Sequence, residues 1–70
     1  MTQDDTEAVR LFAEAAAQGY SLALYNLAWH QEEGLGTARD VAAAIQNYRL
    51  AKAQGISLAE GPLARLAGAV

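Results

Sequence analysis

The residue best suited to acid–base or metal chemistry is His30, the chain's one histidine, which Glu32 and Glu33 follow closely. Imidazole and carboxylate groups bind metals and exchange protons. A zinc site, however, needs three or four converging ligands, and residues spaced i, i+2 and i+3 on one helix do not supply them. With no cysteine and one histidine in so short a chain, neither a Cys–His nor a Ser–His–Asp site can be assembled. We therefore predict no catalytic residue, no metal site and no cofactor, and we expect His30 to be solvated or to line a groove near a helix end.

A second candidate is the sequence Gly34-Leu35-Gly36, whose glycines are of the kind found in phosphate-binding loops. The dinucleotide-binding fingerprint needs a strand before the glycines and a helix directly after them, and the Walker form needs Gly-Lys-Ser/Thr. Neither pattern is present, so we interpret the sequence as a turn. Asp40 is best explained as a helix N-cap, and its neighbour Arg39 as a solvated side chain.

A third candidate is a surface for a protein partner on the helix expected near residues 21–32. One face of that helix carries Ala23, Leu27 and Ala28, and further large apolar residues lie outside this face. These are Leu22, Leu24, Tyr25 and Trp29. Flanking helices could cover all of them; alternatively, Tyr25 and Trp29 lie in a groove or at a subunit contact, where large aromatic side chains act as anchors. The partner-binding residues predicted by this second interpretation are Tyr25, Asn26, Trp29 and His30.

The composition limits the classes of protein to which the chain can belong. Its 70 residues suffice for one small domain, and 53% of them are hydrophobic. The formal net charge of −3 argues against nucleic acids and anionic membranes as main partners. The N-terminal residues lack the basic start and apolar run of a secretory signal, and no window of about 20 apolar residues could span a bilayer. We expect a cytoplasmic protein that is all-α, because helix-forming residues dominate and no segment alternates like a strand.

The sequence contains an internal repeat, which predicts how the segments that carry these candidate residues are arranged. The sequence AAAQGYSLA at residues 15–23 returns as AKAQGISLA at residues 51–59, 36 positions later. The match continues at the same offset, for example from Asp4 to Asp40 and from Phe12 to Tyr48. A fixed period between about 20 and 50 residues is typical of a solenoid, here one built from stacked helical hairpins.

Four helices are expected from the apolar periodicity. They run from about Thr6 to Gln18, from Ser21 or Leu22 to about Glu32, from Val41 to Gln54, and within about Ser57 to Ala67. Asp4 and Asp40 are the expected N-caps, and Gly19 and Gly55 are expected to end the first and third helices. Pro62 is expected to kink the fourth helix or to delay its start.

Large apolar and small side chains are expected to alternate in the core, so that helices approach closely and the gaps are filled. The expected core residues are Phe12, Ala23, Leu27, Ala28, Ala44, Ile45, Tyr48 and Ala51. Charged side chains are expected on solvated helix faces. These are Arg10, Glu14, Glu32, Arg49 and Lys52.

Residues 23–55 resemble the Sel-one-like (Sel1-like) repeat, a relative of the tetratricopeptide (TPR) repeat. The residues that carry the resemblance are Ala23-Leu24-Tyr25-Asn26-Leu27-Ala28, Gly34-Leu35-Gly36, Asp40, Ala44, Tyr48, Ala51 and Gly55. The chain departs from the family at Ala28, where Gly is usual, at Gln31, where an aromatic is usual, at Thr37, where Val is usual, and at Lys52, where Ala is usual. These departures bear on the packing near Gln31 and leave the hairpin itself in place.

The resemblance implies a TPR-like α/α superhelix of about four antiparallel helices in a single domain, 1–70. One full repeat would span about 20–55, between half-repeats at 4–19 and 56–70. It also implies a non-enzymatic scaffold that holds a protein or peptide partner and carries no catalytic residue.

We therefore predict an interaction module that binds a peptide or helix in a groove lined by the second and fourth helices. Both end helices carry apolar side chains where terminal repeats normally carry polar caps, so we expect self-association, as a homodimer, or a partner that covers the ends. The alternative is a structural homo-oligomer subunit or a piece of a longer repeat array. An enzyme or enzyme-regulatory subunit is the remaining alternative, and no group of residues in the sequence supports it.

Overall fold

The computed structural model describes residues 4–68, and within this range the chain is helical with no strand. The elements are α1 (Asp5–Ala17), α2 (Ser21–Glu33), α3 (Val41–Ala53), a 3-10 turn (Ser57–Ala59) and α4 (Glu60–Leu66). Each of the three long helices begins and ends within one or two residues of the sequence-based expectation. The all-α prediction is therefore confirmed.

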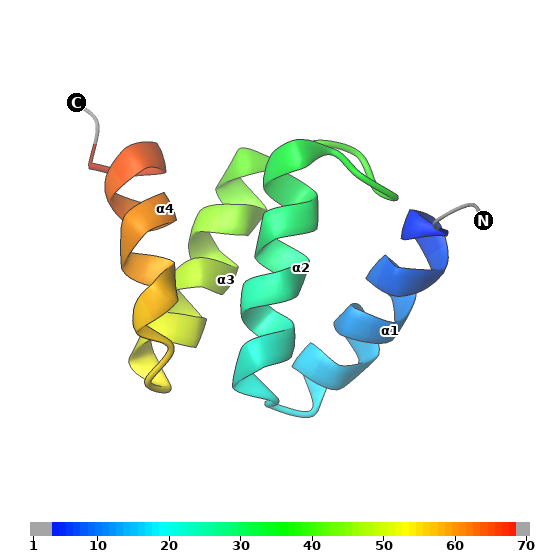
Figure 1. Cartoon of the computed structure of the whole chain (residues 1–70), viewed down its shortest axis with the longest axis horizontal. Helices are drawn as coiled ribbons and strands as arrows, with labels where there is room; N and C mark the ends of the chain where they lie inside the picture. The colour runs from blue at the N-terminus through cyan, green and yellow to red at the C-terminus, as the bar shows by residue number, and fades with distance from the viewer. Residues whose placement is uncertain (1–3, 69–70) are drawn as a thin grey trace.

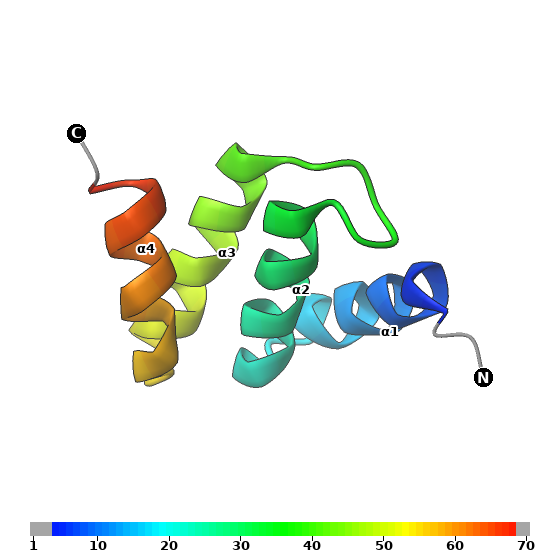
Figure 2. The ribbon, with the colours of Figure 1, turned by 45° about the horizontal axis from the view of Figure 1, so that its top comes forward.

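The helices follow one another across the molecule in chain order, from α1 at one side to α4 at the other (Figure 1). Successive helices run in opposite directions, so that α2 and α3 form the central hairpin and α1 and α4 pack on its two sides (Figures 1 and 2). This is the stack that the 36-residue repeat predicts, because each helical unit packs against its neighbours in the row.

The repeat is visible in how the helices begin and end. The side chains of Asp4 and Asp40 accept hydrogen bonds from the backbone N–H three residues later, at 3.1 and 3.0 Å. After α1 and α3 the chain turns at Gly19 and Gly55, with φ of 90° and 101°. Glycine adopts this left-handed conformation without a Cβ clash, which makes it the natural helix terminator. Both the capping and the terminating predictions are confirmed.

The fourth helix begins late, and Pro62 explains why. Residues Ser57–Ala59 form a 3-10 turn, and the α-helix begins at Glu60, which places Pro62 in its first turn. Backbone N–H groups in the first turn have no partner within the helix, so the N–H that proline lacks is not missed there. Of the two outcomes expected for Pro62, the delayed start is the one observed.

The loop between α2 and α3 returns to the N-terminal end of α1 (Figure 2). Gly36 has φ of 75°, and a Cβ at this position would lie 2.2 Å from the carbonyl oxygen of Asp5. Only a residue without a side chain allows the two backbones to approach this closely. The loop therefore attaches α1 to the central hairpin.

The core lies between α2, α3 and the 3-10 turn before α4. Its buried residues are Leu24, Ala28, Ala44, Tyr48, Ala51 and Ala59. Six of the eight expected core residues are buried, all of them in α2 and α3, whereas Phe12 and Ile45 are half-buried. For Leu24 the alternative of cover by a flanking helix is the one observed, because Leu24 is 5% exposed and packs in the core with residues of α3.

None of the helices in the described part of the chain has the length and apolarity that a bilayer crossing requires.

Candidate protein-interaction surface

The most exposed row of α2 carries four side chains that we call the α2 face. They are Leu22, Asn26, Trp29 and Glu33, which are spaced i, i+4, i+7 and i+11 and therefore lie along one side of the helix. Leu22 is 55% exposed and Trp29 is 41% exposed. The opposite sides of α2 pack against α1 and α3, so these side chains stand on a helix that is supported from both flanks.

Trp29 is supported by His30, which lies beneath the surface. The His30 ring packs edge-on against Trp29, with ring centroids 5.0 Å apart, and also contacts the ring of Phe12 on α1 at 5.4 Å. Its Nδ1 lies 2.9 Å from the backbone carbonyl oxygen of Asn26, and its Nε2 lies 3.9 Å from a carboxylate oxygen of Asp5. His30 is 9% exposed. Of the two placements expected for His30, the solvated one is therefore wrong, because two aromatic rings and a carbonyl group lie against its ring.

Tyr25 lies at the border between the α2 face and the core. It is half-buried and packs edge-to-face against Tyr48 of α3, with ring centroids 5.6 Å apart. Of the four predicted partner-binding residues, the structure thus places Trp29 and Asn26 on the accessible face, Tyr25 at its edge and His30 behind it. Leu22 and Glu33 share the face and were not among the predicted site residues, although their helical spacing from Trp29 was a sufficient signal.

At the 36-residue offset, the positions equivalent to the α2 face lie on the 3-10 turn and on α4. Leu58, Pro62 and Arg65 occupy the positions of Leu22, Asn26 and Trp29. Leu58 is 64% exposed, and the Arg65 side chain is 58% exposed. Residues 4–68 enclose no pocket, so any binding on these two rows takes place on an open surface.

Glu32 links the helices that carry these two rows from inside the molecule. Its carboxylate accepts a hydrogen bond from the Tyr48 hydroxyl at 2.9 Å and a second from the Arg65 guanidinium of α4. Its backbone carbonyl accepts a third, from Arg39 Nε at 3.0 Å. One residue of α2 is thereby linked to α3, to α4 and to the loop.

The protonation behaviour of these groups follows from the contacts. The hydrogen bond from Arg65 is the main reason that the pKa of Glu32 is lowered, and the Tyr48 hydroxyl acts in the same direction against the effect of burial. Burial, together with the hydrogen bond to Glu32, raises the pKa of Tyr48, and the hydrogen bond to Glu32 raises the pKa of Arg65. Glu32 is thus an ionised carboxylate inside the fold.

The expectation that Glu32 is solvated is wrong, since it is 6% exposed. The sequence did contain a signal for this, because Glu32 follows Ala28 by four residues and so lies on the same inner side of the helix. A buried carboxylate needs partners, and both Tyr48 and Arg65 are far from it in sequence, so the spacing alone did not identify them.

The remaining chemical candidates are structural. Gly34 and Gly36 form the turn described above, and Asp40 is an N-cap as predicted. Within residues 4–68, no three His, Cys, Asp or Glu side chains cluster in a way that could hold a metal ion. The geometry therefore leaves a supported, partly apolar face on α2 as the feature that could act on another molecule.

Comparison with known proteins agrees with this description. The sequence model of the Sel1 repeat matches residues 1–20 and again residues 21–56, so the second match covers the α2–α3 hairpin and the turn after it. No curated protein and no solved structure matched the chain. Sel1 repeats are non-catalytic, TPR-like helical repeats that generally serve as protein-interaction scaffolds. With two matches that cover most of the sequence and the antiparallel hairpins they require, this chain belongs to the Sel1 repeat family.

Proposed function

We propose that this chain is a non-enzymatic interaction module that holds a peptide or helix of a protein partner against the α2 face and the neighbouring row of α4. The observation that carries the proposal is the exposure of Trp29 and Leu22 on one row of a helix whose other sides are packed. Exposed aromatic side chains on a rigid support are the usual anchors of protein interfaces.

The chemistry of the two rows indicates what the partner presents. An apolar side chain of the partner would be buried between Leu22 and Trp29, and the Asn26 side-chain amide offers a donor and an acceptor to its backbone. Glu33 lies at the end of the row, and the whole chain carries a net charge of −3. A neutral or basic segment is therefore favoured over an acidic one.

His30 and Tyr25 act in this proposal as supports. His30 holds the Trp29 ring from behind, and Tyr25 joins the face to the core through Tyr48. Little ordering is then needed when the partner binds, which reduces the entropic cost of association.

The proposed domain organisation keeps the sequence-based boundaries. One full repeat spans about 20–55, with half-repeats at 4–19 and 56–70, in a single domain. The cytoplasmic location stays a proposal of the same kind.

The test is selection of binders from a random peptide library displayed on phage, with the 70-residue chain as target. We expect the selected peptides to shift the fluorescence of Trp29, the chain's one tryptophan, and to lose about tenfold or more in affinity for Trp29→Ala. The control is Leu35→Ala, which removes a 37% exposed side chain from the loop and is expected to bind as the parent does. Equal affinity for the parent chain and Trp29→Ala would reject the proposed face.

A second candidate role is that of a homo-oligomer subunit or of a segment in a longer repeat array. It is favoured by Leu11, which is 51% exposed and lies on α1 and so on a different helix from the α2 face. Measurement of the mass of the 70-residue chain over a range of concentrations tests the oligomer role.

A further inference from the structure

The two end helices each have a side that their counterparts in the central hairpin bury. At the 36-residue offset, α1 corresponds to α3, and α4 corresponds to α2. In the hairpin, Ala44, Asn47 and Ala51 of α3 face Leu24, Ala28 and Gln31 of α2. On α1 the equivalent residues, which we call the α1 outer face, are Ala8, Leu11 and Ala15, and on α4 the equivalent residues, the α4 outer face, are Glu60, Ala64 and Ala67.

The exposure of these residues shows that both outer faces are only partly covered. Leu11 is 51% exposed, Glu60 and Ala64 are also exposed, and the other three residues are half-buried. The counterparts of Glu60 and Ala64, which are Leu24 and Ala28, are 5% and 0% exposed. Within residues 4–68, α1 is thus not covered on its outer face as α3 is by α2, and α4 is not covered on its outer face as α2 is by α3.

The two outer faces are also chemically matched to each other. Across the central hairpin, Asn47 of α3 donates a hydrogen bond to Gln31 of α2 at 2.8 Å. At the equivalent positions α1 has Leu11 and α4 has Ala67, so both members of the polar pair are apolar. A polar residue at one of the two positions alone would be left unsatisfied when the faces meet.

A second polar pair of the hairpin has changed in the same way. The Tyr48 hydroxyl donates to Glu32 at 2.9 Å, and the equivalent positions on the end helices carry Phe12 and Gly68. The hydroxyl group and the carboxylate are thus both absent. Because the Phe12 ring packs on His30 of α2, this second change shows only that neither end helix carries a polar group here that would need a partner across the contact.

We propose that copies of this chain associate head to tail, with α1 of one copy packed on α4 of the next as α3 packs on α2. This inference rests on the second role proposed above and leaves the α2 face free. The contact continues the existing row of helices, since α1 and α4 stand at its opposite ends (Figure 1). Because two different faces meet, each dimer keeps one free copy of each face, and association proceeds to longer open chains or rings.

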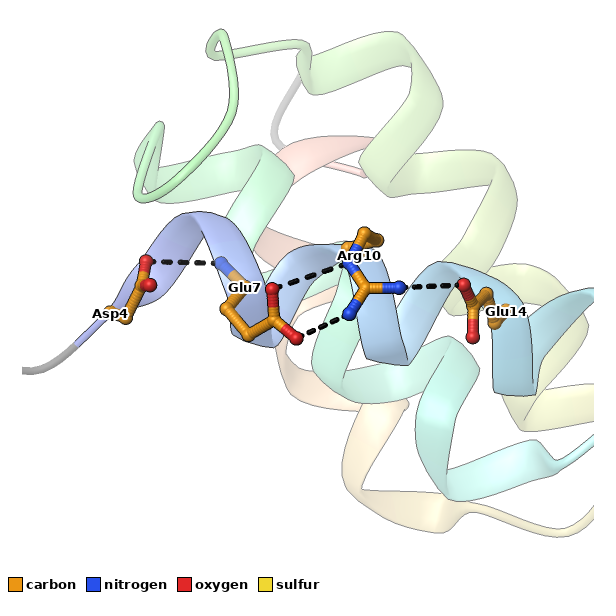
Figure 3. A network of polar contacts seen from close by, with 4 residues as sticks. All are labelled: Asp4, Glu7, Arg10 and Glu14. Carbon is orange, nitrogen blue, oxygen red and sulfur yellow. Dashed lines mark hydrogen bonds and ion pairs between the residues drawn. The ribbon is translucent and has the colours of Figure 1, made fainter.

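The charges around the contact indicate a weak association. Glu7, Arg10 and Glu14 form a ladder of ion pairs along α1 (Figure 3), so these charges are already paired within the helix. Glu60 does not suit a packed contact, because it places a charged side chain where the hairpin buries its counterpart Leu24. Glu60 pairs with Lys52 of its own chain at 3.8 Å, and it must lose part of its hydration when the faces meet.

The test is sedimentation of the 70-residue chain and of two variants that each block one face. Leu11→Lys blocks the α1 outer face, and Ala64→Lys blocks the α4 outer face. Each lysine follows a glutamate by four residues, Glu7 or Glu60, so the monomer helices gain a favourable pair and circular dichroism should show unchanged helicity. We expect the parent chain to grow in mass with concentration, each variant alone to stay monomeric, and an equimolar mixture of the two to form one-to-one dimers through the one intact contact.

The outcomes separate this inference from the broader role. A parent chain that stays monomeric at all concentrations overturns both. If Ala64→Lys alone still self-associates, the oligomer role stands and the head-to-tail contact is rejected. Peptide binding at the α2 face is expected to be the same for all three proteins.

A gain-of-association variant gives an independent check. Glu60→Leu restores the side chain that α2 carries at Leu24, and we expect it to lower the dissociation constant about tenfold, because one leucine is newly buried. The matched control is Leu22→Gln, which removes a leucine of similar exposure, 55% against 51% for Leu11, from the α2 face. It is expected to leave association unchanged, and weaker association of Glu60→Leu than of the parent chain would contradict the proposed contact.

Discussion

The central hairpin and the end helices are built from the same repeated unit, yet they bury their equivalent residues to different extents. Ala44, Tyr48 and Ala51 of α3 are 0% exposed, whereas α1, with Phe12 in place of Tyr48, has no fully buried residue. The difference is not one of helix length or capping, since both helices have 13 residues and an aspartate N-cap. It arises because α3 has neighbours on two sides, which shows that burial in such a stack depends on the adjacent units.

The polar residues of the two regions differ accordingly. Inside the hairpin, Glu32 is buried because Tyr48 and Arg65 satisfy its carboxylate. The end helices carry no such group on their outer faces except Glu60, which is exposed. A charge is thus placed inside only where the chain itself provides its partners.

The largest expected effect concerns how α1 is attached to the hairpin. Gly36→Ala places a methyl group against the backbone of Asp5 and requires a residue with a side chain at φ of 75°. We expect a loss of about 3 kcal/mol in the free energy of unfolding, because the strained backbone and the steric clash add. Urea titration monitored by circular dichroism measures this loss.

Gly19→Ala is the matched control for this change. Gly19 also has a positive φ, of 90°, but nothing lies within 4 Å of the added Cβ. The loss should therefore be about 1 kcal/mol, from the backbone conformation alone. Equal losses for the two variants would mean that the contact between the loop and α1 contributes nothing to stability.

A second substitution compares the same position inside and outside the stack. Ala28→Leu adds a large side chain where alanine is 0% exposed, and overpacking is expected to destabilise the protein by about 1–3 kcal/mol. Ala64→Leu makes the same change at the exposed equivalent on α4 and should alter stability by less than about 0.5 kcal/mol. Thermal unfolding of dilute samples tests this, and a large loss for Ala64→Leu would show that the α4 outer face is already covered.

The helix boundaries could be predicted from sequence because local residues determine them. Asp4 and Asp40 cap through a hydrogen bond within three residues, and Gly19 and Gly55 terminate through their own backbone conformation. Such signals need no knowledge of the rest of the fold. The 36-residue repeat then predicted that these helices pack side by side in a stack.

The candidate site was harder to predict because its residues depend on distant neighbours. Trp29 was expected outside the packed face of α2 and is 41% exposed, whereas His30, which was expected to be solvated or to line a groove, packs against Phe12 of another helix. Glu32 was misplaced for the same reason, since its partner Arg65 lies 33 residues away in the sequence. Helical spacing gives the side of a helix on which a residue lies, and only the packing shows whether that side is covered.

A smaller effect is expected from the aromatic pair that distinguishes the two regions. Tyr48→Phe removes the hydroxyl that donates to buried Glu32 at 2.9 Å, and it should cost about 1–2 kcal/mol because the carboxylate loses a donor. Phe12→Tyr makes the reverse change at Phe12 of α1, which is half-buried, and we expect solvent to reach the added hydroxyl, so that the cost is less than about 0.5 kcal/mol. Urea unfolding of both variants measures the contrast, and equal costs would place the two rings in equivalent environments.

The smallest effect is the dependence of stability on pH that Glu32 confers. The Arg65 hydrogen bond lowers the pKa of Glu32 in the folded chain below its ordinary value of 4.5. A carboxylate whose pKa is lowered by folding stabilises the protein fully above its unfolded pKa, and this contribution is lost as the pH falls through the folded pKa. Because the Arg65 side chain is 58% exposed, water screens the pair and the contribution is modest.

The stabilities of the parent chain and Glu32→Gln should therefore differ most at neutral pH and converge below pH 4.5, as the parent carboxylate takes up its proton. Urea unfolding of both proteins at neutral and at acidic pH tests this. Glu33→Gln makes the same chemical change at the exposed neighbouring residue and is the control for a general effect of net charge. If the difference between the parent chain and Glu32→Gln stayed constant as the pH falls, the carboxylate of Glu32 would not be held in its ionised form by the hairpin, and its burial would have to be explained by packing alone.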